Sequence, residues 1–440
     1  MNRCAARTSL SLFAVFALAG CSRDVEWSGS LDDFLESRPE RFGAAVADPE
    51  KHRVQVVYTQ IDRDVNNVPA FRTYTYRVDE GEYFYPASTV KLPTALLALE
   101  KINELAIAGL TRDTTMLTGA NRDSQTAVIS DPTSPTGLPS VAHYIRKILL
   151  VSDNDAFNRL YEFLGQQPLN EAMHAKGYGT TRIMHRLEVA LGIEENRHTN
   201  PMVFVGEDRM RHEQPAGMSD IDYTAGEPIL LGRAEIVDGV RLERPKDFAE
   251  KNAYPLMAQH DVIRALMFPE SVPADRRFGL TEEDYRFVHR YMSMSPSESG
   301  IQAYDDPDSY PGGYVRFLLS GGEGELPNNV RVFNKVGDAY GFLTDAAFIV
   351  DFEHGVEFIL AATVYTNENG TFNDDEYEYD DVGFPFLREL GLAIYELELA
   401  RPRAHKPNLD RFRGSEKGTD RKQETESGER DADDRADDAQ

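Results

Sequence analysis

Short segments near both ends of the chain have the residue pattern of strands, and the first of them alternates hydrophobic and polar positions. Residues 54–61 and 71–78 lie near the start, and residues 344–352 and 356–365 lie near the end. All four are rich in β-branched and aromatic residues, a composition typical of strands. A His-Gly pair between the last two predicts a tight hairpin.

Helical spacing of apolar residues dominates the middle of the chain. Residues 89–105, 138–149 and 156–164 are predicted helices, residues 384–401 a closing amphipathic helix, and residues 31–47 one helix before the first strand. The order of strands, a helical middle, more strands and a last helix predicts a single α+β domain. We expect an antiparallel sheet of about five strands, built from both chain ends and covered by helices.

The first residues have the pattern of an export signal. Two arginines precede an apolar run at residues 10–18, and small residues then lead to Cys21. The run is too short to span a membrane, which takes about 20 residues. A small-residue site ending in cysteine resembles a bacterial lipoprotein signal, which implies lipidation at Cys21; an ordinary secretory signal is the alternative. Ser22, by resemblance to lipoprotein sorting, implies the periplasmic face of the outer membrane.

The chain therefore divides into four predicted parts. Residues 1–20 are the signal peptide and residues 21–30 a polar tether. Residues 31–401 form the folded domain. Residues 402–440 combine few apolar residues with many charges, so we expect a disordered tail.

Charge and cysteine content narrow the function. The chain carries 47 Lys and Arg against 74 Asp and Glu, a net charge of −27. This acidic balance argues against nucleic acids and anionic lipid surfaces as partners, because binding them needs basic patches. The only cysteines are Cys4 and Cys21, so the exported chain would have no internal disulfide.

Three short patterns carry the candidate chemistry, and each could alone be an ordinary helix cap or a solvated lysine. Lys91 shares a helix face with Ser88. A serine hydroxyl needs a base to become a nucleophile, and a lysine can be that base when burial and a second cation lower its pKa. Lys335 could supply the second cation. The patterns, in chain order, are Ser88-Thr89-Val90-Lys91, Ser152-Asp153-Asn154 and Lys335-Val336-Gly337.

Together these patterns resemble the class A β-lactamase-like, penicillin-recognising serine hydrolases. The resemblance covers roughly residues 31–200 and 254–400. It implies that Ser88 is the nucleophile, Lys91 its base and Ser152 a proton relay towards the leaving group. Further implied roles are substrate binding by Asn154 and Lys335, and an oxyanion hole made by the N–H groups of Ser88 and of a residue just after Gly337, near Asp338.

The loop that should carry the deacylating glutamate departs from the family pattern. The usual tryptophan-glutamate-proline-glutamate run is absent. Glu188 lies 36 residues after Ser152 (188 − 152 = 36), close to the family's spacing, although its neighbours match a structural acidic position. Glu194 and Glu195 are rivals. Because deacylation needs a positioned base, efficient β-lactamase activity is doubtful.

Two further departures concern Val336 and an insertion. Val336 replaces the Thr or Ser whose hydroxyl in the family helps to hold a substrate carboxylate. Residues 202–253 are an apparent insertion, expected to form a rim or lid over the site. Within them, residues 234–242 predict a hairpin that turns at Asp238-Gly239.

The sequence thus predicts a serine hydrolase or acyltransferase that forms an acyl-enzyme on Ser88. Its substrate would be a β-lactam, a cell-wall peptide or a related amide or ester. The alternative is a non-catalytic envelope-binding lipoprotein on a retired β-lactamase fold. No zinc-binding His-Glu-x-x-His pattern is present, so no metal or cofactor is expected, and the oligomeric state stays open.

Overall fold

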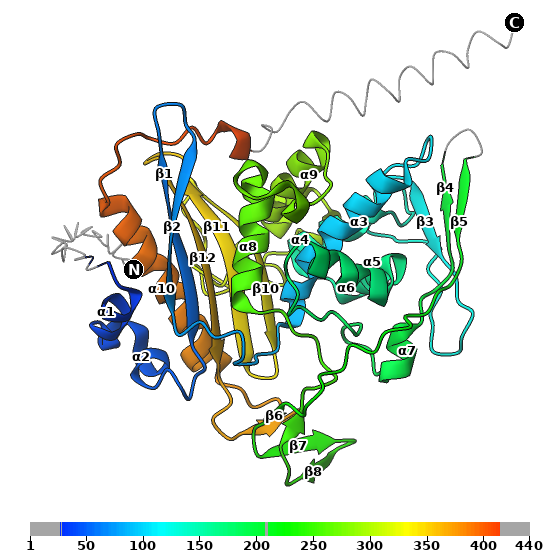
Figure 1. Ribbon diagram of the computed structural model, residues 1–440, viewed down its shortest axis with the longest axis horizontal. Helices are drawn as coiled ribbons and strands as arrows, with labels where there is room; N and C mark the ends of the chain where they lie inside the picture. The colour runs from blue at the N-terminus through cyan, green and yellow to red at the C-terminus, as the bar shows by residue number, and fades with distance from the viewer. Residues whose placement is uncertain (1–26, 28, 207–209, 414–440) are drawn as a thin grey trace, which may run out of the picture.

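The computed structural model describes residue 27, residues 29–206 and residues 210–413 (Figure 1). The predicted signal peptide and Cys21 lie outside the described residues, as does the chain beyond residue 413.

A five-stranded antiparallel sheet forms the centre of the molecule, as the sequence predicts. Its strand order is β10-β11-β12-β1-β2, so strands from the end of the chain pair with strands from its beginning. The edge strand β10 carries the Lys335 motif. The strands are β1 (Gln55–Arg63), β2 (Pro69–Tyr76), β10 (Val330–Ala339), β11 (Phe342–Asp351) and β12 (Val356–Tyr365).

Apolar side chains cover both faces of this sheet. In β11, Phe348 belongs to the cluster on the face towards α3 (Lys91–Leu105) and α8 (Leu256–Met267), whereas Ile349 belongs to the cluster on the face towards α10 (Phe384–Ala400). The alternation follows from the pleat of a strand. Figure 1 shows α10, α1 (Leu31–Glu36) and α2 (Pro39–Ala47) on one side of the sheet and the helical region on the other.

The predicted helices are all present, with small shifts at their ends. They are α3 (Lys91–Leu105), α4 (Val141–Val151), α5 (Asn154–Leu164) and α10 (Phe384–Ala400). Further α-helices between α5 and β10 are α6 (Gln166–Ala175), α7 (Ile193–Arg197), α8 (Leu256–Met267) and α9 (Glu282–Ser293). A 3-10 turn at Ala87–Val90 precedes α3 and carries Ser88.

Two boundary predictions are wrong. Residues 31–47 form two helices, α1 (Leu31–Glu36) and α2 (Pro39–Ala47). Pro39 lacks a backbone N–H and disfavours helical geometry at the residue before it, so the first helix cannot continue. The predicted tail starts at residue 402, but Phe412 is buried and packs against Phe348 at 4.8 Å between ring centroids. The folded part therefore extends into the residues after 402.

The insertion divides into two parts. Its beginning forms β4 (Met202–Val205) and β5 (Arg211–Gln214), which join β3 (Thr115–Thr118). Its later part contains β6 (Leu230–Leu231), β7 (Ala234–Val237), β8 (Val240–Leu242) and β9 (Lys246–Asp247), and β13 (Thr371–Phe372) pairs with β7. Figure 1 shows these two parts at separate places, on the right and at the bottom.

The predicted hairpin at 238–239 is confirmed, whereas the rim prediction fits only part of the insertion. Asp238 and Gly239 both have positive φ (50° and 75°), as the favoured two-residue hairpin turn requires. Gln214 contacts Lys101 near the end of α3 opposite to Ser88. Phe248, by contrast, packs against Tyr85, three residues before Ser88.

Candidate active site

The turn that carries Ser88 has unusual backbone geometry. Ala87 has φ +45°, a left-handed conformation that costs free energy in a non-glycine residue and often occurs at functional sites. Ala87 and Thr89 are buried, while Ser88 stays partly exposed. The Ser88 hydroxyl makes no hydrogen bond to any residue in the part of the chain that the structure describes. It is therefore open to an incoming molecule.

Gly337 allows β10 to approach this turn closely. A Cβ atom at Gly337 would lie 2.5 Å from the carbonyl oxygen of Pro86 and 2.9 Å from the backbone nitrogen of Ser88. Real Cβ atoms do not come so near to backbone atoms. The glycine thus brings the backbone of β10 beside the Ser88 N–H, as two donors of an oxyanion hole require.

Replacing Gly337 with alanine should push the Ser88 turn away from β10. We expect a loss of about 1–3 kcal/mol in the free energy of unfolding, the usual cost of overpacking, together with slower acylation of Ser88. Urea denaturation and the rate of labelling by a serine-reactive probe measure the two effects. Gly179→Ala, where nothing lies within 4 Å of the new Cβ, is the control. Wild-type stability and labelling in Gly337→Ala would contradict the close approach.

Lys91 is fully buried and points at the second motif. Its Nζ donates to the carbonyl oxygen of Ser152 and, at 2.5 Å, to Oδ1 of Asn154, and it lies 3.3 Å from Ser152 Oγ. Burial and the neighbouring charge of Lys335 hold the pKa of Lys91 well below its usual value. A lysine needs such an environment to be neutral and so to accept a proton.

Lys335, on strand β10 of the sheet, also contacts Ser152. Its Nζ donates to Ser152 Oγ at 2.8 Å and to the carbonyl oxygen of Val336 at 2.9 Å. Burial lowers the pKa of Lys335 to about 7. Ser152 Oγ thus bridges the two amines, in the geometry of a proton relay. The side chain of Val336 packs on the α10 face of the sheet, so it does not line the site.

The structure brings Glu188 to the site as well. Asn154 Nδ2 donates to Glu188 Oε2 at 2.7 Å, and Glu188 contributes to the electrostatic environment of Lys91. Glu188 itself has φ +58°, a second strained position. Asn158, one turn after Asn154, exchanges two hydrogen bonds with the backbone of Leu187 and so holds the residue before Glu188.

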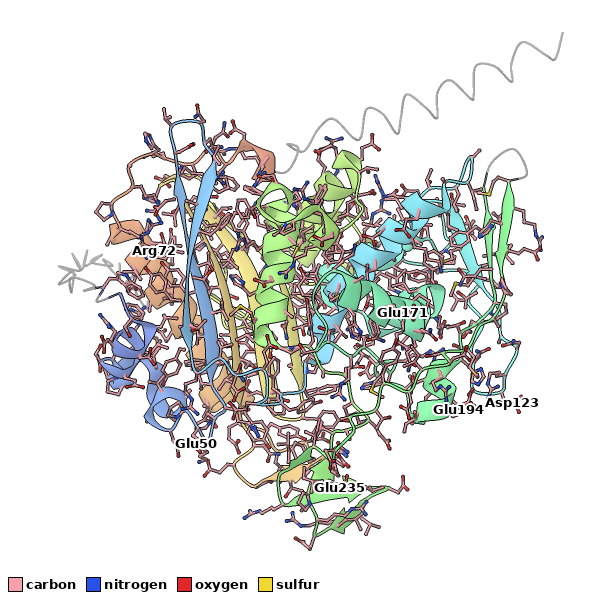
Figure 2. All side chains as sticks on the ribbon, in the orientation of Figure 1. Glu50, Arg72, Asp123, Glu171, Glu194 and Glu235 are labelled. Carbon is pink, nitrogen blue, oxygen red and sulfur yellow. The ribbon has the colours of Figure 1, made fainter. Side chains whose placement is uncertain are left out.

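The two rival glutamates are engaged elsewhere. Glu195 forms an ion pair with Arg122 at 2.5 Å and accepts a hydrogen bond from Ser124. Glu194 pairs with Arg197 at 3.2 Å. Glu194 is part of α7 and lies at the surface (Figure 2). Of the three candidates, Glu188 alone contacts a residue of the motifs.

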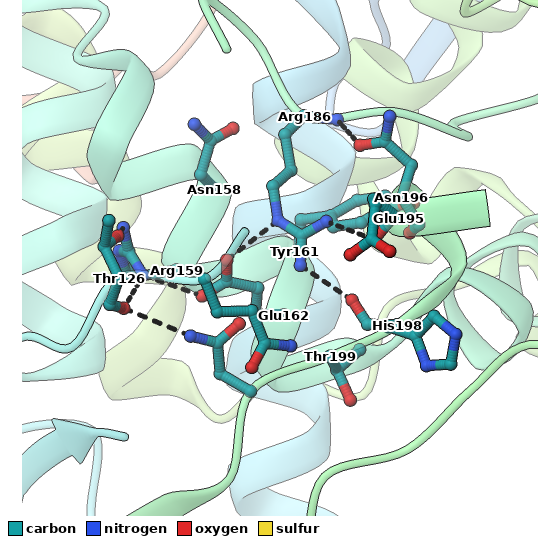
Figure 3. A network of polar contacts seen from close by, with 12 residues as sticks. Thr126, Asn158, Arg159, Tyr161, Glu162, Arg186, Glu195, Asn196, His198 and Thr199 are labelled. Atoms are coloured by element: carbon teal, nitrogen blue, oxygen red, sulfur yellow. Dashed lines mark hydrogen bonds and ion pairs between the residues drawn. The ribbon is translucent and has the colours of Figure 1, made fainter. Parts of the chain in front are cut away.

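A buried ionic network fixes the loop that carries Glu188 (Figure 3). Arg186 donates to Glu162 at 2.8 Å and to the carbonyl oxygen of His198 at 2.7 Å. Arg159 approaches the other oxygen of Glu162 at 3.0 Å. Sequence reasoning missed Glu162 and Asn158 as supports of the site. Their signal is a polar side chain on the buried side of a strongly amphipathic helix.

Replacing Arg186 with methionine should leave the buried Glu162 carboxylate paired with Arg159 alone. We expect a loss of about 3–5 kcal/mol of stability, the usual cost of breaking a buried ion pair, measured by urea denaturation. Glu194→Gln breaks an exposed pair and should cost about 1 kcal/mol or less. Equal stability losses in the two variants would contradict a structural role for the network.

Asp338 lies at the exposed edge of the site, just after Gly337. The protein atoms around its carboxyl raise the pKa of Asp338, whereas the charges of Lys335 and Lys91 lower it. In the part of the chain that the structure describes, its side chain forms no hydrogen bond or ion pair.

Neither a metal-binding cluster nor a membrane-spanning helix occurs among the described residues. No cluster of three or more His, Cys, Asp and Glu side chains is arranged there to hold a metal ion. No helix in the described ranges has the length and apolar character to cross a membrane.

The chain is similar to one family of known proteins and to several solved structures. Residues 41–218, which include the Ser88 and Ser152 motifs, match the model of the beta-lactamase enzyme family. No curated protein matches the chain significantly. Solved structures similar to it include a β-lactamase from Sphaerobacter thermophilus (13% identity, 82% of this chain and 96% of that one, TM-score 0.46) and PBP-A (13%, 83% and 97%, 0.47). A third is the TLA-1 extended-spectrum β-lactamase (15%, 84% and 99%, 0.46).

The residues matched by the family model include Ser88, Lys91, Ser152 and Asn154, four of the residues that meet at the site. Over residues 41–218 the chain is similar to the beta-lactamase enzyme family.

Proposed function

We propose that the protein is an acyl-transferring serine hydrolase in which Ser88 becomes acylated. The observation that carries the proposal is the pair of buried amines, Lys91 and Lys335, which meet at Ser152 Oγ. Keeping two lysines out of water is costly. Such groups with perturbed pKa values are typical of functional sites.

The contacts support a role for each residue in acylation. Lys91, with its lowered pKa, takes the Ser88 proton as Oγ attacks the carbonyl carbon of the substrate. The N–H groups of Ser88 and Asp338 stabilise the negative oxygen. Ser152 passes a proton to the leaving group. The hydrogen bond between Ser88 and Lys91 is not formed in the free protein; such bonds often tighten only when substrate binds.

Glu188 is the proposed base for the second half of the reaction. Its carboxylate, held by Asn154, would activate the water that hydrolyses the acyl-enzyme. The residue sits on a loop without the family's usual run, in a left-handed conformation. We therefore expect slow turnover of penicillins, with cell-wall peptides or related amides and esters as the natural substrates.

Intact-mass analysis of the soluble domain tests the proposal. A fluorophosphonate should add one adduct, mapped to Ser88, and a penicillin should give a long-lived adduct on the same residue. Steady-state penicillin hydrolysis should stay below a kcat/KM of about 10⁶ M⁻¹s⁻¹, which lies within the range of efficient enzymes. A fluorophosphonate adduct elsewhere, or none, would refute the proposed nucleophile and favour a binding protein.

We also propose that the protein is exported and lipid-anchored at Cys21 on the periplasmic face of the outer membrane. The sequence of the first 21 residues supports this. Metabolic labelling with a palmitate analogue in a bacterial host should mark the wild type and not Cys21→Ser. Labelling that survives this substitution would contradict the anchor.

A further inference from the structure

The carboxylate of Asp338 is the one acidic group of the site without a partner among the described residues. Glu188 binds Asn154, and Asp153 accepts from the backbone of Ala156 and pairs with Lys147. Asp338 is exposed. A charged group at the entrance with no protein partner is available to a ligand.

The two nearby cations do not satisfy this carboxylate. Lys335 directs its Nζ to Ser152 and to its own strand, and Lys91 directs its Nζ to Ser152 and Asn154. Both lysines are close enough to influence the charge of Asp338, yet neither forms an ion pair with it. A negative substrate group beside Asp338 would meet repulsion there, and a positive group would find an unused acceptor.

One tyrosine ring, that of Tyr314, lies near Asp338, and the ring of Tyr310 packs against it. Tyr314 is 37% exposed and lies within electrostatic reach of Asp338. The ring of Tyr310 packs against Tyr314 at 5.1 Å and against Tyr304 at 5.4 Å between centroids. An exposed tyrosine ring near a carboxylate suits a positive group, because a cation is attracted to both the ring face and the carboxylate.

We propose that Asp338 and Tyr314 form a subsite for a cationic, ammonium-bearing group of the substrate, next to the carbonyl that Ser88 attacks. The location of the subsite follows from the position of Asp338 directly after Gly337. The backbone N–H of Asp338 is proposed to hold the carbonyl oxygen, so its side chain meets the substituents that flank that carbonyl. The inference rests on the proposed function and narrows its substrates to amides or esters that carry a positive charge near the reacting bond.

Three fluorophosphonates that differ only at the end of one arm test the subsite. The ends are trimethylammonium, its neutral isostere tert-butyl, and carboxylate. In each reaction Ser88 Oγ bonds to phosphorus, fluoride leaves and Lys91 takes the proton. Intact-mass spectrometry gives the labelling rates. For each protein variant, the rate with each probe is divided by the rate with the tert-butyl probe. This ratio removes any effect that the amino-acid substitution has on the reactivity of Ser88 itself.

We expect wild type to react with the ammonium probe at least about tenfold faster than with the tert-butyl probe, the effect of one interaction with a charged group. Asp338→Asn, which keeps the backbone N–H, should bring this ratio close to one. Tyr314→Leu should lower it in part. Asp123→Asn removes one negative charge at a remote exposed site (Figure 2) and should leave the ratio unchanged.

An unchanged ratio in Asp338→Asn, or a wild type that prefers the carboxylate probe, would overturn the subsite. Tert-butyl labelling of Ser88 without an ammonium preference refutes the subsite alone. Failure of all three probes to label Ser88 refutes the proposed function, and the subsite with it.

Discussion

Replacing Lys91 with methionine should slow acylation of Ser88 by about 10²–10⁴-fold, the usual effect of removing a positioned general base. Methionine fills much of the same buried volume, so the packing around α3 should be kept. Stopped-flow or intact-mass measurement of fluorophosphonate labelling gives the rate. Ser88→Ala should show no labelling at this site.

Lys101 provides a matched control for this prediction. It lies on the same helix and is partly buried, and burial lowers the pKa of Lys101 to about 8. Its Nζ contacts Gln214 at the other end of α3, away from the motifs. Lys101→Met should label at nearly the wild-type rate. Equal slowing in both variants would show that Lys91 acts through stability and not as a base.

The pH dependence of acylation gives a second measure of Lys91. The amine must be neutral to accept a proton, so the rate should rise with pH until Lys91 is deprotonated. Burial, and then the charge of Lys335, lower the pKa of Lys91. Removing the Lys335 charge with Lys335→Met should therefore raise that pKa and move the acidic limb of the profile to higher pH. A limb that stays in place would contradict the coupling.

Replacing Glu188 with glutamine should slow deacylation by about 10²-fold, at the lower end of the range for a lost general base. The amide keeps the size of the side chain but cannot take a proton from water. Acylation should change little, because it depends on Lys91 and the oxyanion hole. The lifetime of the penicillin adduct, followed by intact mass after rapid dilution, measures the effect.

Glu194→Gln is the control for the deacylation experiment. Glu194 belongs to the same loop region but pairs with Arg197. Its adduct lifetime should match that of the wild type. If the Glu188 variant releases its adduct as fast as the wild type does, another group activates the water.

The fold could be predicted because the spacing of apolar residues indicates each helix and strand, and the order of these elements indicates the topology. Strands β11 and β12 alternate core residues between two apolar clusters, and their hairpin at 351–356 has the expected turn chemistry. The first motif could be recognised because one helix turn fixes the spacing of Ser88 and Lys91, and the other two could be recognised by their order after it. Their meeting at Ser152 could not be read from the sequence, since it depends on how α4 and α5 pack beside β10.

Two features escaped prediction because tertiary contacts decide them. Sequence alone could not choose between Glu188 and its rivals, because the choice depends on which carboxylate finds Asn154 and which finds Arg122. The polar segment after residue 402 looked disordered by composition. In the structure, the ring of Phe412 packs against the core residues Phe333 and Phe348 and so holds this segment on the domain.

The pairing of β1 with β12 has a consequence for how the chain acquires activity. Gln55 lies opposite Thr363 in the sheet, so more than 300 residues separate partners that touch. Such high contact order slows folding. During synthesis β1 and β2 have an open edge until the last strands arrive, and an open edge invites aggregation. Nascent chains that end before β10 should therefore need protection, and they cannot assemble the Lys335 half of the site.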